Sequence, residues 1–461
     1  MTYLLSPSDP GEAARFIRDR LPAGGLFAGH TWRVSPTPFP LGPDLAEELR
    51  GLGRVLLAFY QAANRLYLES VASRQPAWIA QWLDQGKPAE LVALQRSPGF
   101  KSALPRVIRP DLLLTEAGWT LVELDGVPGG IGLTAWLNQT YSAWSAAHPP
   151  DSTGLAPPPV IGGADGMLQG FSGIFGNAPR VHVVVSEEAA TYRPEMDWLC
   201  CELNDIEGAA GPGRFWVRNT QSQDIAPGDA VYRFFELFDL PQVPNASWLF
   251  HQALERRITL TPPPKPIFEE KLLLALLWNR NLREFWRREL GEGFFDRLRQ
   301  HVPYTWVLDP APLPPHAALP ELNLTDWRQL AGLSQRDRQL VIKVSGFSPL
   351  AWGARGVWLG SDLAKAEWAA VVDRALAGFA QNPCVLQRYH QPRRIETAWY
   401  DFDHERLTPL AGRARLCPYY FLTGQGDAAR AHWGGVLATV CPLDKKIIHG
   451  MSEAILMPCT A

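Results

Sequence analysis

Apolar side chains recur at the three- and four-residue spacing of amphipathic helices through most of the first hundred residues. The pattern is clearest over residues 45–67 and continues over residues 73–97, and Asp44 is placed to cap the first turn of the longer helix. The aromatic residues of these stretches fit a core better than a ligand site. We therefore predict a helical N-terminal region, residues 1–100, to which no chemistry is assigned.

Shorter runs of apolar residues follow from residue 109 onward. In some of them apolar and polar residues alternate, and others are continuously apolar. Residues 111–115 and 120–125 read as the strands of a hairpin, which a glycine-rich loop over residues 126–134 joins to a predicted helix over residues 136–147. Beyond them a helix is expected to begin near Tyr192, and further strands are expected at residues 179–186, 215–218 and 230–235. Strands that alternate with helices favour an α/β layer, and we predict the fold class α/β (α+β).

Proline-rich segments mark the expected divisions of the chain. Residues 148–159 are predicted to be a linker or surface loop, and residues 261–266 are the best candidate for a domain boundary. The predicted parts are therefore the helical region, an α/β part over residues 101–260 and a third part over residues 261–461.

The hairpin ends in acidic residues that strand alternation places on one face, Glu123 and Asp125, and the partner strand can bring Asp111 beside them. Oxygen ligands suit hard cations such as Mg²⁺, which usually binds one or two protein carboxylates together with the phosphates of a nucleotide. Arg109 points to the same side as Asp111 and can bind a phosphate or carboxylate oxygen. The alternative is a hairpin with a solvated acidic edge that this arginine neutralises.

Two lysines are candidates for binding phosphate. Lys271 lies near the start of a strongly apolar helix, residues 269–278, where a positive charge opposes the helix dipole and needs a partner; the two acids just before it would serve. Lys343 ends a predicted strand that opens into a loop with three glycines, whose N–H groups can approach phosphate oxygens. This loop is not a Walker A motif. A hairpin with a surface lysine would explain it nearly as well.

Polar residues also follow two predicted strands in the last third of the chain. The strand at residues 382–390 can hydrogen-bond an adenine edge through its backbone, with Gln387 close by, and His390 is expected to be structural. Arg413 and Arg415 alternate on one face of a later strand. Two arginines that project together suit a triphosphate, although they could equally pair with surface acids.

Composition argues against several classes of protein. The 461 residues are 46% hydrophobic and can bury a large core, and a net charge of −3 gives no electrostatic case for nucleic acid or an anionic membrane. Six cysteines form no CxxC pair, which predicts reduced thiols. The start lacks a signal-peptide pattern, and no apolar run approaches the roughly 20 residues of a membrane helix. We expect a folded cytoplasmic protein without a nucleic-acid or membrane partner.

Taken in order, these parts resemble the circularly permuted ATP-grasp proteins, most closely the synthetase domain of glutathionylspermidine synthetase. Arg109-Pro-Asp111 is followed, at that family's twelve-residue step from Asp to Glu, by Glu123-Leu-Asp125, with Asp125 where the family has Asn. The carboxylates precede both lysines, as in the permuted family.

Further segments carry the same resemblance, which covers residues 105 to 421. Lys271 opens a similar helix, and Lys343 precedes a similar Gly-x-x-Gly loop at Gly353 to Val357. Tyr232-Arg-Phe-Phe-Glu236 and Gln387-Arg-Tyr389 are also similar to segments of the family.

The resemblance implies a circularly permuted ATP-grasp fold and an ATP-dependent carboxylate-amine ligase that forms an amide through an acyl phosphate. ATP and Mg²⁺ are the implied cofactors, and the implied substrates are a small-molecule or peptide carboxylate and an amine, with a polyamine as one candidate. Two alternatives stay open, a kinase with a hydroxyl acceptor on the same scaffold and a catalytically decayed nucleotide-binding protein. The sequence does not indicate an oligomeric state.

The resemblance also implies a role for each candidate residue. Mg²⁺ would be held by Asp111, Glu123 and Asp125. Arg109 and Arg415 would act in catalysis: Arg109 would bind the transferring phosphoryl group or the acyl-phosphate oxygen, and Arg415 or Arg413 would add a positive charge on the nucleotide side. Nucleotide binding would involve Lys271, Lys343, Gly353, Arg355, Gly356, Gln387, Tyr389 and Arg413.

Overall fold

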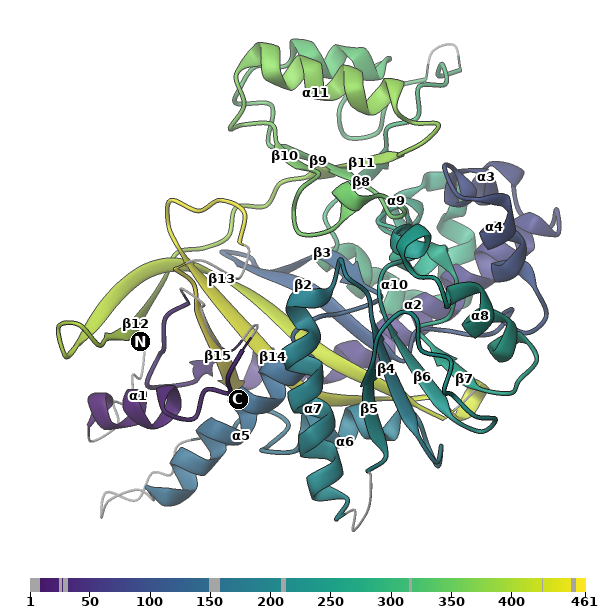
Figure 1. Ribbon diagram of the computed structural model, residues 1–461. Helices are drawn as coiled ribbons and strands as arrows, with labels where there is room; N and C mark the ends of the chain where they lie inside the picture. The colour runs from purple at the N-terminus through teal and green to yellow at the C-terminus, as the bar shows by residue number, and fades with distance from the viewer. Residues whose placement is uncertain are drawn as a thin grey trace.

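The computed structural model describes residues 9–24, 27, 32–148, 158–208, 213–314, 317–424, 426–448 and 453–461. The fold is mixed α/β, as predicted, and the described residues form one seven-stranded and two four-stranded sheets. Figure 1 shows a large body and, above it, a small lobe that contains one of the four-stranded sheets. Most of the predicted linker, residues 149–157, lies outside the described residues.

The seven-stranded sheet has the predicted hairpin at its edge. Its strands pair in the order β1-β15-β14-β13-β2-β3, and β12 pairs with β13. The hairpin strands are β2 (Val107–Thr115) and β3 (Gly118–Asp125); the others are β1 (Phe39–Pro40), β12 (Ile395–Asp401), β13 (Arg406–Thr423), β14 (Arg430–Pro442) and β15 (Ile455–Thr460). Because β13 pairs with β2, the hairpin lies beside a strand from the far end of the chain.

The second sheet is parallel, in the order β5-β4-β6-β7. Its strands are β4 (Val181–Val185), β5 (Phe215–Arg218), β6 (Ala230–Phe234) and β7 (Thr259–Thr261), and the predicted helix is α7 (Arg193–Ile206). Every residue of β4 and β6 is buried, as strands covered on both faces require. The strands and the helix predicted here are confirmed.

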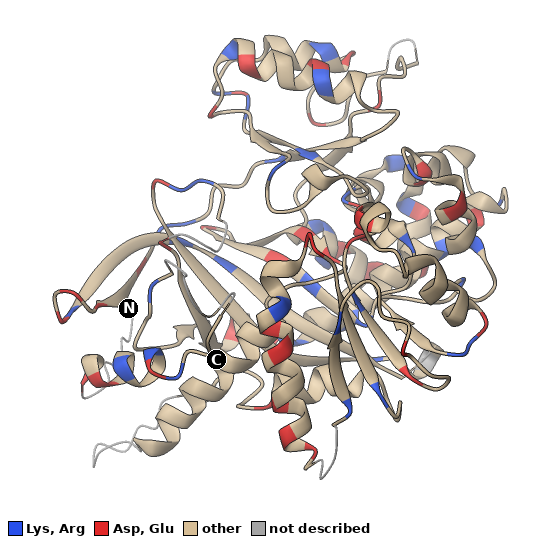
Figure 2. Ribbon diagram, in the orientation of Figure 1, with Lys and Arg blue, Asp and Glu red and all other residues tan. Residues whose placement is uncertain are grey.

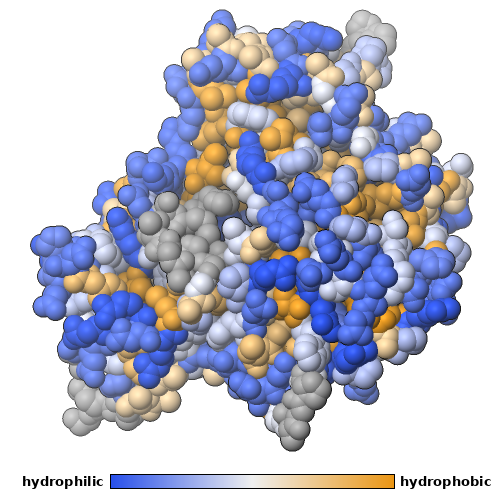
Figure 3. All heavy atoms as spheres, viewed as in Figure 1, coloured by the Kyte–Doolittle hydropathy of each residue, from blue (hydrophilic) through white to orange (hydrophobic). Residues whose placement is uncertain are grey.

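The small lobe has an antiparallel sheet in the order β10-β9-β11-β8. Its elements are β8 (Thr305–Val307), β9 (Leu340–Val344), β10 (Val357–Leu359), β11 (Cys384–Arg388) and α11 (Lys365–Ala377). In Figure 1, α11 covers the upper face of this sheet, and buried Trp368 belongs to a hydrophobic cluster separate from the main core. Figure 3 shows hydrophobic surface on the small lobe near its junction with the body.

Within the described residues, the N-terminal region contains four helices and the short strand β1. Its helices are α1 (Pro10–Arg18), α2 (Pro43–Val71), α3 (Ala77–Asp84) and α4 (Ala89–Arg96). The other helices of the body are α5 (Ile131–Ala147), α6 (Gly166–Gly173), α8 (Ala246–Leu254), α9 (Leu272–Trp278) and α10 (Arg283–His301). Short 3-10 helices are η1 (Ala190–Tyr192), η2 (Leu237–Gln242), η3 (Pro266–Glu269), η4 (Arg280–Leu282), η5 (Trp327–Gly332), η6 (Pro349–Ala351) and η7 (Gly426–Ala428).

Two predicted helix starts were wrong. Asp44 lies in the first turn of α2 but does not cap it, because the N-cap is Gly42 and no side chain bonds to that end. Helix α5 begins at Ile131 instead of residue 136, so the glycine-rich loop ends at Gly130. Gly130 takes a φ of 84°, a left-handed conformation that glycine adopts without strain and that lets the helix begin early.

The predicted domain boundary, residues 261–266, is buried in the structure. Lys265 within it is 1% exposed, and its ammonium donates hydrogen bonds to the main-chain oxygens of Lys101 and Ala103. The division of the chain into three parts stays a prediction.

Two expectations from composition can be compared with the described residues. All six cysteines are free thiols, as predicted. Figure 2 shows acidic and basic residues interspersed over the body and the small lobe, in keeping with the small net charge. Among the described residues, no helix is both long enough and apolar enough to cross a membrane.

Candidate active site

A cavity of 460 Å³ lies where the small lobe meets the body, and we call it the central cavity. Its floor comes from the hairpin and β13, and its roof from the segment between β9 and β10. Eleven of the thirteen residues with predicted roles line it: Arg109, Asp111, Glu123, Asp125, Lys271, Lys343, Gly353, Arg355, Gln387, Tyr389 and Arg415. Gly356 and Arg413 are not among the lining residues.

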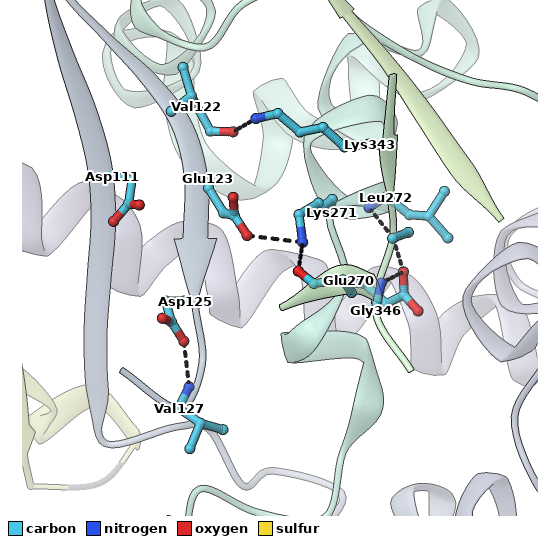
Figure 4. Close-up of polar contacts among 12 residues, drawn as sticks. Asp111, Val122, Glu123, Asp125, Val127, Glu270, Lys271, Leu272, Lys343 and Gly346 are labelled. Atoms are coloured by element: carbon cyan, nitrogen blue, oxygen red, sulfur yellow. Dashed lines mark hydrogen bonds and ion pairs between the residues drawn. The ribbon is translucent and has the colours of Figure 1, made fainter. Parts of the chain in front are cut away.

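The register of the hairpin places its charged residues opposite one another. Asp111 pairs with Glu123 across the two strands, and Arg109 pairs with Asp125. Figure 4 shows Asp111 on one strand and the other two carboxylates on the next. The three carboxylates therefore line the same cavity.

Asp111 lies between two guanidinium groups. Its carboxylate is 3.0 Å from Arg415 Nη1 and 3.3 Å from Arg109 Nε, and the Cys417 thiol donates to it over 3.4 Å. Burial acts to raise the pKa of Asp111, but the charges of Arg415 and Arg109 outweigh burial and hold the pKa below its usual value. Asp111 is therefore ionised at neutral pH and holds both arginines in place.

Asp125 ends the hairpin and is tied to the loop that follows. Its carboxylate is 2.7 Å from Arg109 Nη2 and accepts a 2.9 Å hydrogen bond from the N–H of Val127. Burial raises the pKa of Asp125, Arg109 opposes the rise, and the charge of Asp111 adds to it. The carbonyl oxygen of Gly129, further along the loop, accepts hydrogen bonds from Arg109 at 3.1 Å and Tyr419 at 2.7 Å. The loop after the hairpin is thus held from two strands.

Lys271 finds its partner across the cavity. Its ammonium is 2.9 Å from Glu123 (Figure 4). It also donates a 3.0 Å hydrogen bond to the main-chain oxygen of Ala351. Burial acts to lower the pKa of Lys271, but Glu123 outweighs burial, so the pKa is raised.

The two acids before Lys271 have other partners, which resolves the alternative left open by the sequence. Glu269 is 2.6 Å from Arg233, and Glu270 pairs with Lys87. A lysine at the start of α9 is therefore balanced by a carboxylate of the hairpin.

Lys343 is buried, so the interpretation as a surface lysine was wrong. The residue is 7% exposed, and its ammonium donates a 2.9 Å hydrogen bond to the main-chain oxygen of Val122 on β3. Burial lowers the pKa of Lys343, and the neighbouring charge of Lys271 lowers it further while Glu123 opposes the change. A buried ammonium whose hydrogen bond goes to a carbonyl oxygen is suited to receive an anion.

The roof loop follows Lys343. Gly353 and Ala354 have φ values of 64° and 60°, and Arg355 pairs with Glu188 of the body. Gly356 packs closely against the loop, because a Cβ at this position would come within 2.6 Å of the carbonyl oxygen of Leu350.

The two arginines predicted to act together on β13 separate in the structure. Arg415 points into the cavity and pairs with Asp111. Arg413 donates a 2.9 Å hydrogen bond to the carbonyl oxygen of Leu443 instead. Gln387 and Tyr389 do line the cavity, and the amide of Gln387 donates to the Thr305 hydroxyl at 3.1 Å.

The donor set of the hairpin is of the oxygen type that Mg²⁺ takes. Within the described part of the chain, however, no three His, Cys, Asp or Glu side chains lie close enough together to hold a metal ion. In the structure, Asp111 and Asp125 bind arginines and Glu123 binds Lys271. These carboxylates fit Mg²⁺ chemically, and holding it jointly would require them to draw closer.

One acidic wall of the cavity was not predicted. Glu236 and Glu269 line it beside Asp125, together with Tyr192 and Trp352, whose ring centroids are 6.2 Å apart. Burial raises the pKa of Glu236 well above its usual value, and the charges of Glu269 and Asp125 raise it further. Glu236 follows the carboxyl end of β6, the edge of a parallel sheet where ligands commonly bind, and this position is the signal that sequence reasoning missed.

A segment near the C-terminus completes the cavity. Lys446, Ile447 and Ile448 line it, and Lys446 pairs with Asp362 of the small lobe. No motif in the sequence marks this segment.

Comparisons with known proteins show similarity at the level of the fold. No family model matches the chain, and no curated protein matches it. A glutathione synthetase-like effector from Globodera pallida aligns with a TM-score of 0.56 at 12% identity, over 98% of both chains. A candidate gamma-glutamylcysteine synthetase from Methylobacillus flagellatus aligns at 0.39 and 13% identity, over 92% of this chain and 89% of that one, which is too distant to carry an argument.

The first alignment spans nearly the whole chain, including the N-terminal helices that the sequence resemblance left out. The chain therefore shares its fold with a synthetase-like protein. The circular permutation and the closer resemblance to glutathionylspermidine synthetase stay predictions.

Proposed function

We propose that this protein is an ATP-dependent carboxylate-amine ligase, distantly related to the ATP-grasp enzymes. The observation that carries the proposal is the central cavity, where carboxylates and cations far apart in the chain lie together; Arg415 and Asp111, 304 residues apart, are in contact. The fold shared with a glutathione synthetase-like protein supports the scaffold.

The positively charged side chains of the central cavity support the binding of a nucleoside triphosphate. Lys343 can receive a phosphate oxygen without breaking an ion pair, because its hydrogen bond goes to the Val122 carbonyl. Lys271 would bind phosphate from the opposite side, and the roof loop, with Gly353, would cover it. Asp111, Glu123 and Asp125 would hold Mg²⁺, which neutralises charge on the phosphates. The adenine would lie against Gln387 and Tyr389.

The proposed reaction has two steps. The substrate carboxylate attacks the γ-phosphate of ATP, which gives an acyl phosphate and ADP. The amine nitrogen then forms a bond to the acyl carbon as the bond to phosphate breaks, and it loses a proton. Arg109 and Arg415 are placed to bind the oxygens of the transferring group, which is the main demand on the protein because phosphoryl transfer depends on positioning and charge.

The acidic wall supports a positively charged amine as the second substrate. Glu236, Glu269 and Asp125 lie on one side of the cavity, next to the rings of Tyr192 and Trp352. Carboxylates and aromatic faces both attract ammonium groups. A polyamine, which keeps a second positive charge while one nitrogen reacts, fits this wall better than a neutral amine does.

The test is ADP release from ATP and Mg²⁺ with glutathione as a peptide acid and spermidine as a polyamine, each alone and together. We expect release only when an acid and an amine are both present, after a panel of such pairs has been screened. Release with a hydroxyl compound and no amine would favour a kinase. ATP binding without release by any pair would favour a decayed scaffold.

A further inference from the structure

A second cavity, of 390 Å³, lies on the body beside the start of the small lobe, and we call it the hinge cavity. It is lined by the end of α9, the start and the later turns of α10, Tyr304 just before β8, and Glu321. It shares no lining residue with the central cavity. Its volume falls within the range of about 300–1,000 Å³ that small-molecule sites occupy.

The charges around the hinge cavity are unbalanced. Three arginines line it, Arg280, Arg283 and Arg299, against one carboxylate, Glu321. Glu321 itself lies 3.9 Å from Arg388, which lines the central cavity. None of the three arginines takes part in an ion pair within the described part of the chain. Three guanidinium groups that converge beside a single carboxylate leave an excess of positive charge, which can bind carboxylates and phosphates.

The remaining walls are aromatic and carry buried donors. Trp278 stacks on Tyr304, with ring centroids 4.4 Å apart, and the guanidinium carbon of Arg299 is 4.5 Å from the centre of the Trp278 ring. The Trp278 indole N–H and the Arg299 Nε–H are buried and have no hydrogen-bond partner. Buried donors normally have partners, so these two donors are available to an acceptor that enters the cavity.

We propose that the hinge cavity is a second binding site, for an organic anion: a small molecule with a phosphate or carboxylate group on an apolar frame. The anionic group binds the arginines, and the apolar frame lies against Phe295 and the Trp278–Tyr304 stack. A bare oxyanion would leave most of a 390 Å³ cavity unfilled. The site does not depend on the ligase reaction, because it requires only the folded chain.

The test is calorimetric titration of the full-length protein with phenyl phosphate, inorganic phosphate and benzyl alcohol. We expect phenyl phosphate to bind at least about tenfold more tightly than inorganic phosphate, because the ring adds buried apolar area. Benzyl alcohol should not bind measurably, since it lacks the charge. Phenyl phosphate that binds no better than inorganic phosphate would contradict the apolar part of the site.

Variants locate the binding. Arg283 is an exposed residue of α10, so its replacement should not affect folding. Arg283→Gln should weaken phenyl phosphate binding at least about tenfold, because it removes a charge-assisted contact. Arg288→Gln, on the same helix but outside the cavity, and Lys343→Ala, in the central cavity, should bind as the wild type does. Binding that Lys343→Ala abolishes and Arg283→Gln leaves unchanged would place the anion in the central cavity and overturn the proposal.

Discussion

The floor and the roof of the central cavity hold their charged groups in different ways. On the floor, Asp111 binds two arginines, and its side chain is only 10% exposed. On the roof, the pair of Arg355 with Glu188 has side chains that are 41% and 32% exposed, and the main-chain oxygen of Ala351 accepts a hydrogen bond from Lys271 of the body. The floor is built from strands of one sheet, whereas the roof is a loop on a separate lobe.

This difference indicates which half is formed before a ligand binds. Buried, mutually paired charges keep the floor in place, because separating them would leave a charge without a partner. Exposed pairs contribute little, so the pair of Arg355 with Glu188 adds little to the attachment of the roof, which depends on hydrogen bonds from Lys271 to Ala351 and from Gly346 to Glu270. We therefore expect a nucleotide to bind to a preformed floor and to make its further contacts with the lysine and the loop of the small lobe.

The largest effect should come from Asp111→Ala. Removing this carboxylate leaves Arg109 and Arg415 close together in a buried place, which should cost about 3–5 kcal/mol of unfolding free energy. Urea unfolding measures the loss. The matched control is Glu396→Ala, whose pair with Arg394 is exposed and should be worth less than about 1 kcal/mol. Equal losses in the two variants would contradict a preformed floor.

Lys343→Ala tests the roof. The ammonium of Lys343 is buried against a carbonyl oxygen, so removing the side chain should leave the free energy of unfolding unchanged or higher. ATP affinity should fall roughly ten- to hundredfold, because a charge-assisted contact is lost. Calorimetry measures the affinity, and Lys365→Ala, exposed on α11, is the control.

The pH dependence of ATP binding checks the same residue. Because the pKa of Lys343 is lowered, its ammonium deprotonates at a lower pH than that of an ordinary lysine. ATP affinity should therefore fall as pH rises through this pKa in the wild type, and the variant should lack that part of the dependence. An unchanged pH profile in the variant would remove Lys343 from the phosphate site.

Glu236→Gln tests the acidic wall. We expect amine affinity to fall roughly tenfold, because the variant loses one contact to an ammonium group. Burial raises the pKa of Glu236 well above its usual value, and a bound ammonium should lower that pKa and so release a proton from the carboxyl group. Spermidine titrations in two buffers of different ionisation enthalpy measure this proton. The wild type should release it and Glu236→Gln should not, whereas Glu255→Gln, on the surface, should match the wild type.

The smallest effect should come from Arg355→Gln, which removes the exposed link between roof and body. Stability should change by less than about 1 kcal/mol. ATP should dissociate a few-fold faster, which stopped-flow displacement measures. A large loss of stability would mean that the roof is held as firmly as the floor.

The sequence predicted the parts of the site that depend on local pattern. Strand alternation over residues 120–125 placed Glu123 and Asp125 together, and the glycines after Lys343 predicted a loop. It did not predict which charges pair, because Lys271 with Glu123 and Arg415 with Asp111 are joined only by the packing of distant elements. The choice between a surface and a buried lysine depended on the same packing.

The most direct test of the account is ATP binding by calorimetry, with and without Mg²⁺, in the wild type and in Glu123→Gln. Glu116→Gln, exposed on the turn of the same hairpin, is the matched control. The account predicts Mg²⁺-dependent binding that Glu116→Gln keeps and Glu123→Gln loses. A well-folded wild type that binds no ATP, or a Glu123→Gln variant with wild-type metal-dependent affinity, would contradict it.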